Sequence, residues 1–125
     1  MELDGEAHEK YREAGRILTT VLGEARARVE PDATLLSVAE FAEDRIREEG
    51  GRPAFPVNIS LDEEASHATP GRDDEATFGE SMVCLDVGVH VDGYIADAAV
   101  TVDLTDTPEM VEAAEAALDA AVEAV

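Results

Sequence analysis

The dipeptide Asp92-Gly93, set between two runs rich in β-branched residues, constrains the fold of this chain more than any other feature. It is the strongest short-range signal for a two-residue hairpin turn, because both positions must tolerate positive φ angles. Residues 82–102 are therefore expected to form an antiparallel hairpin. With the turn at these two residues, Val91 pairs with Tyr94, and this pair fixes the register of both strands.

This register sorts the side chains of the hairpin onto two faces. One face is apolar along both strands and is expected to be buried; it carries Leu85, Val87, Val89, Val91, Tyr94, Ala96, Ala98 and Val100. The other face brings Asp86 and Asp97 together as diagonal neighbours, with a Cβ separation of up to about 7 Å. Gly88 lies opposite Asp97, and its missing side chain predicts space there for an ion or a water molecule.

Two interpretations of Asp86 and Asp97 remain open from spacing alone. Aspartate is depleted in strands and adjacent like charges repel, which favours a divalent cation between the carboxylates. The alternative is a solvated acidic face in an acidic chain. Two carboxylates are also fewer ligands than hydrolytic metals usually take, because such sites have three or more from protein.

The charge of the chain indicates its surroundings and excludes one class of partner. Thirty acidic residues against nine basic ones give a formal net charge of −21, and the acids are spread along the whole sequence. Self-repulsion of this size opposes folding in dilute buffer and is screened by salt, which indicates adaptation to high ionic strength. The scattered Lys and Arg residues form no basic cluster, so nucleic acid is not an expected partner.

Length and composition predict a single domain over residues 1–125. Hydrophobic residues make up 45% of the chain but aromatics only 4%, so the core is expected to consist mainly of Val, Leu, Ile and Ala. The single cysteine, Cys84, is interpreted as core filling and allows no intramolecular disulfide. No run has the length of a membrane span or the pattern of a secretory signal, so a cytoplasmic protein without membrane partners is expected.

Helical periodicity precedes the hairpin. Residues 5–28 repeat apolar side chains at three and four positions, and a second helix is expected from an N-cap at Thr34 to the Gly50-Gly51 pair. Two prolines limit residues 52–60 to an edge strand or an extended loop. Residues 61–79 are polar and include His67, so this loop is a candidate site wall. Helices beside an antiparallel hairpin make the expected fold class α+β.

Two motifs in order resemble one family. AFPVNISLDEEASHATP (residues 54–70) and LDVGVHVDGYIADAAVTV (residues 85–102) are similar to sequences of the archaeal type II methionine aminopeptidases, which belong to the pita-bread metallopeptidases of family M24. The spacing of Phe55 to His67 and the eleven positions from Asp86 to Asp97 both match the family. The resemblance implies the N-terminal half of a pita-bread (creatinase/aminopeptidase-like) fold, with helices packed on an antiparallel sheet.

The resemblance also implies an activity and roles for residues. It implies removal of the initiator methionine from nascent polypeptides whose second residue is small, by two divalent ions (Co, Mn, Fe or Zn), with the ribosome as a further candidate partner. Asp86 is expected to hold one metal and Asp97 to bridge both. His67 is expected to contact the substrate near the scissile amide, while Phe55 and Pro56 form the wall of the methionine pocket.

Departures from the family limit what this chain is expected to do alone. The family completes its metal site with one histidine and two glutamates from the second half of the fold, beyond Val125. Residues 109–125 keep a helical period without a capping residue, which predicts a chain that stops within a helix. The chain is therefore expected to be the N-terminal part of the catalytic domain and inactive by itself.

Two alternative functions belong to the same fold. Another pita-bread peptidase, such as a Xaa-Pro dipeptidase, would keep both aspartates but need not keep the FPVN stretch at residues 55–58. A non-catalytic pita-bread protein that binds other macromolecules would have lost its metal ligands, which the presence of Asp86 and Asp97 disfavours.

Overall fold

The hairpin is the central element of the fold. In the computed structural model, which describes residues 4–62 and 68–125, it consists of β3 (Met82–Val91) and β4 (Tyr94–Asp103). Asp92 and Gly93 form the turn with φ angles of 51° and 88°, as a type I′ turn requires. Val91 pairs with Tyr94, so the predicted turn and register are confirmed.

Two short strands flank β3 on the side away from β4. Strand β1 (Arg52–Pro53) pairs with residues 89–90 of β3, and β2 (Asn58–Leu61) pairs with residues 83–86, both antiparallel. Strand β3 is therefore the middle strand, with β4 along one side and β1 and β2 in succession along the other. The expectation of at most an edge strand over residues 52–60 is confirmed.

Two capped helices lie against the sheet. Helix α1 (Gly5–Arg26) begins where the Asp4 side chain accepts a hydrogen bond from the Ala7 backbone N–H at 2.7 Å. Helix α2 (Leu35–Glu48) begins at the predicted cap, with the Thr34 hydroxyl accepting from the Ser37 N–H at 3.1 Å. Helix α1 ends two residues before the predicted boundary, because Ala27 already acts as its C-cap.

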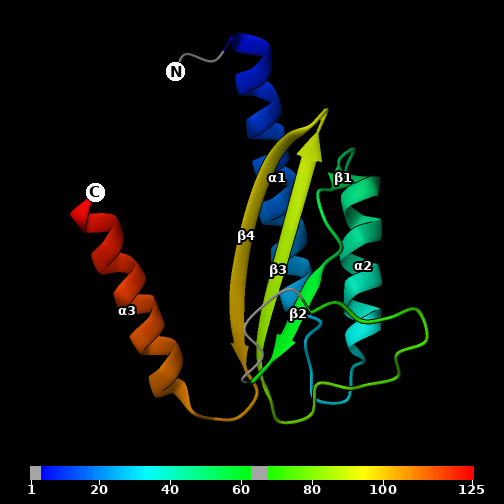
Figure 1. The fold of residues 1–125 in the computed structure, drawn as a ribbon, viewed down its shortest axis with the longest axis vertical. Coiled ribbons are helices and arrows are strands. Elements are labelled where there is room, and N and C mark those ends of the chain that lie inside the picture. Colours follow the sequence, from blue (N-terminus) through cyan, green and yellow to red (C-terminus); the bar gives the residue numbers. More distant parts are fainter. Residues whose placement is uncertain (1–3, 63–67) are drawn as a thin grey trace.

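The core lies between these helices and one face of the sheet (Figure 1). Leu85, Val87 and Val89 of β3 are fully buried, as the alternation predicts. The matching residues of β4 are only half-buried, so the expectation of a fully buried face is wrong for that strand. The physical reason is position: β4 is the outer strand, with its free side away from β3. The buried hydrophobic side chains of the described residues are mainly Val, Leu, Ile and Ala, as predicted, and Phe78 is the largest of the fully buried ones.

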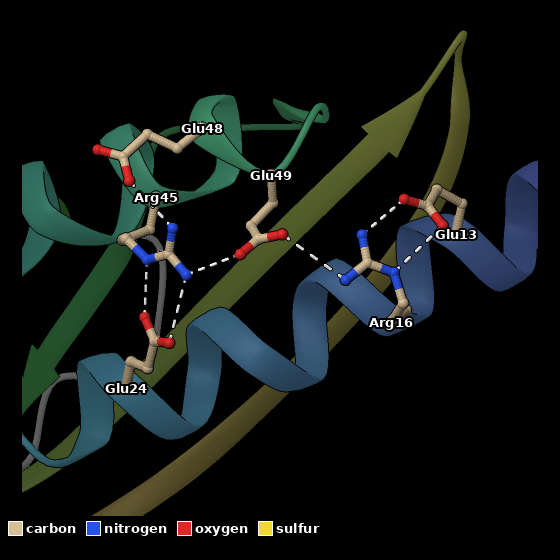
Figure 2. A network of polar contacts seen from close by, with 6 residues as sticks. All are labelled: Glu13, Arg16, Glu24, Arg45, Glu48 and Glu49. Carbon is tan, nitrogen blue, oxygen red and sulfur yellow. Dashed lines mark hydrogen bonds and ion pairs between the residues drawn. The ribbon is translucent and has the colours of Figure 1, made fainter.

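A polar network joins α1 to α2 (Figure 2). The Arg45 guanidinium contacts three carboxylates, those of Glu24 at 2.8 Å, Glu49 at 2.8 Å and Glu48 at 3.0 Å. Glu49 also lies 3.6 Å from Arg16 of α1, which pairs with Glu13. In a chain with few cations, these two arginines neutralise acidic side chains where the two helices approach each other.

Helix α3 (Pro108–Ala124) stands apart from this core (Figure 1). None of its residues is buried within the described part of the chain, and Met110, Leu118 and Val122 are each exposed by about two thirds. Over residues 4–62 and 68–125, no helix combines the length and the apolar composition needed to cross a membrane.

Candidate metal centre

Asp86 and Asp97 share one face of the hairpin, as the register predicts. Asp97 pairs with Gly88 and Asp86 pairs with Ala99, so the two aspartates are diagonal neighbours on adjacent strands. Asp86 is half-buried and Asp97 is exposed. Both line one pocket of about 450 Å³, so the fold directs the two carboxylates to the same space.

The pocket has an apolar wall and a polar floor. Phe55 and Pro56 form the wall, and both lie in the segment between β1 and β2. The polar part consists of Asn58, Thr69, Asp86 and Asp97. Carboxylate oxygens suit divalent cations, so this donor set fits part of a metal site. Across residues 4–62 and 68–125, no cluster of three or more His, Cys, Asp or Glu side chains could hold a metal ion.

Cys84 lies on the same face as Asp86, two positions away on β3. It is half-buried, so the interpretation of Cys84 as core filling is only partly right. Burial raises the pKa of its thiol, and the negative charge of Asp86 raises that pKa further. The thiol is therefore held in its neutral form at pH 7, whereas a metal ligand must be a thiolate.

The space predicted over Gly88 is filled. A Cβ atom at this position would lie 2.3 Å from Cε1 of Phe55, 2.7 Å from its Cζ and 2.9 Å from its Cδ1. The aromatic ring therefore occupies the place where an ion or a water molecule was expected. This expectation was wrong because it considered only the hairpin, whereas the ring comes from the segment that crosses between β1 and β2.

The structure describes four of the five predicted site residues. Phe55 and Pro56 line the pocket of the two aspartates, so these four residues are brought together. His67 lies outside the described residues. The ligand and substrate roles assigned to all five remain predictions.

Asn58 and Thr69 line the pocket and were missed from the sequence. Asn58 pairs directly with Asp86 across β2 and β3. The place of Asn58 beside Asp86 follows from the pairing of residues 58–61 with β3. That pairing was not predicted, because the two prolines nearby disfavoured a regular strand. No local pattern marks Thr69 itself, although it lies within residues 61–79, the loop that was expected to be a site wall.

A second and larger hollow of about 980 Å³ adjoins the pocket. Phe55 and Pro56 line both spaces, so they separate the aspartates from this hollow. Its other lining residues are Glu43, Arg47, Gly50, Gly51, Arg52, Pro53, Ala54 and His90. His90 accepts a hydrogen bond through Nδ1 from the Gly93 N–H at 3.1 Å, so its ring stays beside the turn.

Most of the chain matches one known protein family. The model of metallopeptidase family M24 matches residues 9–125. The methionine aminopeptidase of Archaeoglobus fulgidus is 54% identical over 124 residues, which are 98% of this chain and 43% of that protein. The chain thus spans about two fifths of the length of this curated relative.

Solved structures agree with the fold. The methionine aminopeptidase of Thermotoga maritima superposes with a TM-score of 0.74 at 27% identity, covering 81% of this chain and 43% of that one. The prolidase of Pyrococcus furiosus gives 0.68 at 20% identity, covering 79% and 31%, and shares the fold alone. The predicted class, helices on an antiparallel sheet in the N-terminal half of a pita-bread fold, is confirmed.

Proposed function

Because the chain belongs to metallopeptidase family M24, we propose that it forms the N-terminal part of the catalytic unit of a methionine aminopeptidase. The whole protein would remove the N-terminal methionine from polypeptides whose second residue is small. The observation that carries this proposal is the pocket in which Asp86 and Asp97 meet the aromatic wall of Phe55. The 54% identity to an archaeal methionine aminopeptidase supports the choice of methionine.

The proposed metal ligands in this chain are Asp86, for one divalent ion, and Asp97, for both. Their position on one face of adjacent strands supports the assignment, and repulsion between the carboxylates would be relieved by bound cations. The remaining ligands would be one histidine and two glutamates outside the 125 residues. Bound divalent ions (Co, Mn, Fe or Zn) would supply hydrolytic chemistry by acidifying water and polarising the carbonyl group.

The proposed substrate contacts use the other side chains of the pocket. Phe55 and Pro56 would bind the apolar methionine side chain, since they form the apolar wall beside the carboxylates. His67 would donate a hydrogen bond to the substrate near the scissile amide or pass a proton there. The substrates would be nascent polypeptides, so the reaction would take place in the cytoplasm and the ribosome would be a candidate partner.

Two other functions would use the same fold. A Xaa-Pro peptidase would share both aspartates, but the solved prolidase is only 20% identical to this chain. A non-catalytic binding protein would not need two carboxylates in one pocket. The higher identity to a methionine aminopeptidase and the pocket therefore favour the first proposal.

The direct test is a peptidase assay on the full-length protein loaded with divalent metal. We expect release of methionine from a Met-Gly peptide, no cleavage of a Xaa-Pro dipeptide, and loss of activity on chelation. The 125-residue chain assayed in parallel should stay at background, because it carries two of the five expected ligands. Cleavage of only the Xaa-Pro substrate would favour the prolidase function, and cleavage of neither would favour the binding protein.

We also propose that the protein works at high ionic strength. The net charge of −21 is spread over the chain, and salt would screen the resulting self-repulsion. The midpoint of thermal unfolding should rise steadily with KCl concentration up to molar levels. A midpoint that stays constant or falls over this range would contradict the proposal.

A further inference from the structure

The polar face of β3 is interrupted at Gly88 by an aromatic ring. Asp86, Gly88 and His90 follow one another on this face, and the Phe55 ring lies directly over the glycine. Three ring atoms lie 2.3–2.9 Å from where a Cβ at residue 88 would be. Ordinary carbon contacts need about 3.5–4.0 Å, so any side chain here would have to displace the ring.

The backbone on both sides of Phe55 is anchored, which limits where a displaced ring could go. Before it, the Ala54 N–H donates to the Gly88 carbonyl at 2.9 Å. After it, the Val57 N–H donates to the Glu43 carboxylate at 3.2 Å, and Asn58 pairs with Asp86. The ring can therefore respond by rotating about its side-chain bonds, while its backbone stays fixed to β3 and α2.

The position of the ring sets the size of the space over the aspartates. Phe55 and Pro56 line the 450 Å³ pocket with Asp86 and Asp97 on one side, and the 980 Å³ hollow on the other. A ring displaced from Gly88 must move into one of these two spaces. Either movement changes the wall against which an N-terminal side chain would pack.

We propose that Gly88 is a positioning residue for Phe55: its lack of a side chain lets the ring lie across β3 and fixes the width of the pocket that receives the substrate's N-terminal side chain. Residue 88 thereby determines specificity without touching substrate. This inference rests on the proposed function, because the occupant of the pocket is taken to be a methionine side chain.

The test is a double-mutant cycle in the full-length, metal-loaded protein, with Gly88→Ala, Phe55→Ala and the combined variant. Gly88→Ala should raise KM for a Met-Gly peptide by about tenfold while kcat changes much less, since a displaced wall weakens ground-state and transition-state binding alike. In the Phe55→Ala background the same substitution should leave KM unchanged within about twofold, because the ring atoms are gone. Metal affinity, measured by calorimetry, should be the same in all four proteins.

Gly23→Ala is the matched control, because a Cβ at this helical position meets no described atom within 4 Å apart from its chain neighbours and the backbone of its own helix. It should leave KM unchanged. Urea unfolding of the same four proteins gives a readout independent of activity: Gly88→Ala should lower the free energy of unfolding only when Phe55 is present. That readout also holds if a variant is too unstable to assay.

The outcomes separate this inference from the proposed function. An inactive wild-type protein would count against the function, and the unfolding cycle would still test the contact between Gly88 and Phe55. An active wild type whose KM is unchanged by Gly88→Ala, or raised equally with and without the Phe55 ring, would overturn the inference alone.

Discussion

Helices α1 and α3 have similar apolar periodicity but opposite surroundings. Helix α1 buries six residues against the sheet, and its N-terminus is capped by Asp4. Helix α3 buries none of its residues within the described ranges, and Thr107 at its start makes no side-chain capping bond there. An amphipathic pattern therefore predicts that a helix has a face to bury, but it does not predict what covers that face.

Helices α1 and α3 therefore differ in what stabilises them. A helix packed on a core is stabilised mainly by tertiary contacts, whereas an unpacked helix depends on intrinsic propensity and on its ends. Helix α3 is rich in alanine, which has the highest propensity, and Pro108 lies at its first position. We therefore expect substitutions in α1 to change global stability and substitutions in α3 to change local helix stability in the 125-residue chain.

The largest expected effect is that of Ile17→Ala in α1. Ile17 is fully buried in the core, so its truncation should lower the free energy of unfolding by about 2–5 kcal/mol in urea titration. Leu118→Ala in α3 is the matched comparison, because Leu118 is 64% exposed. It should change the free energy by less than about 0.5 kcal/mol. Equal losses at both positions would show that α3 is packed on the core.

Ala117→Gly should weaken α3 locally. Ala117 is exposed, so the substitution changes backbone propensity by about 1 kcal/mol without removing a packing contact. Amide hydrogen exchange should become faster in α3 and stay the same in α1. Ala42→Gly in α2 is the comparison, since Ala42 is fully buried. Loss of its methyl group should lower the global free energy of unfolding as well. Uniformly faster exchange in Ala117→Gly would contradict the distinction.

Asp103→Ala should loosen the start of α3 by a smaller amount. The Asp103 carboxylate accepts hydrogen bonds from the Thr105 N–H at 2.8 Å and the Thr107 N–H at 3.0 Å, and these bonds hold the turn before the helix. The hydrogen bond from the Thr105 side chain, followed by that from the Thr105 backbone, lowers the pKa of Asp103, although desolvation acts in the opposite direction. Exchange should speed up at residues 105–110 alone. Unchanged exchange there would show that this turn does not depend on the carboxylate.

Glu24→Gln should give the smallest effect, and only in a particular pH range. The hydrogen bond from Arg45 lowers the pKa of Glu24 below its usual 4.5. A group whose pKa is lower in the folded state adds stability above its unfolded pKa and loses it as the pH falls through the folded value. The thermal midpoint of the wild-type chain should therefore fall more than that of Glu24→Gln when the pH drops below 4.5. Parallel curves for the two proteins would contradict a role for this pair.

The hairpin could be predicted because its determinants are local. The turn at Asp92 and Gly93 and the two-residue alternation of side chains fix the register without knowledge of the rest of the chain. The same register placed Asp86 and Asp97 on one face. The ends of α2 could also be predicted from local residues, since Thr34 is its N-cap and Gly50 follows the helix with a φ of 98°.

Features that depend on distant contacts could not be predicted. Phe78 lies in a polar, turn-rich segment, yet its N–H donates to the Ala33 carbonyl at 3.1 Å and its ring is buried in the core. Phe55 reaches Gly88 only because β1 and β2 pair with different parts of β3. Neither contact has a short-range pattern. The single-domain boundary stays a prediction, as do the metal and substrate roles.

The central claim is that Asp86 and Asp97 belong to a metal site, and calorimetric titration of the full-length protein with a divalent metal tests it most directly. We predict that the wild type binds two ions per chain and that Asp97→Ala loses binding, because one carboxylate would serve both ions. Asp73→Ala, which removes an exposed acid from a polar loop, should bind as the wild type does. Unchanged stoichiometry and affinity in Asp97→Ala would contradict the claim and leave the two aspartates as a solvated acidic face.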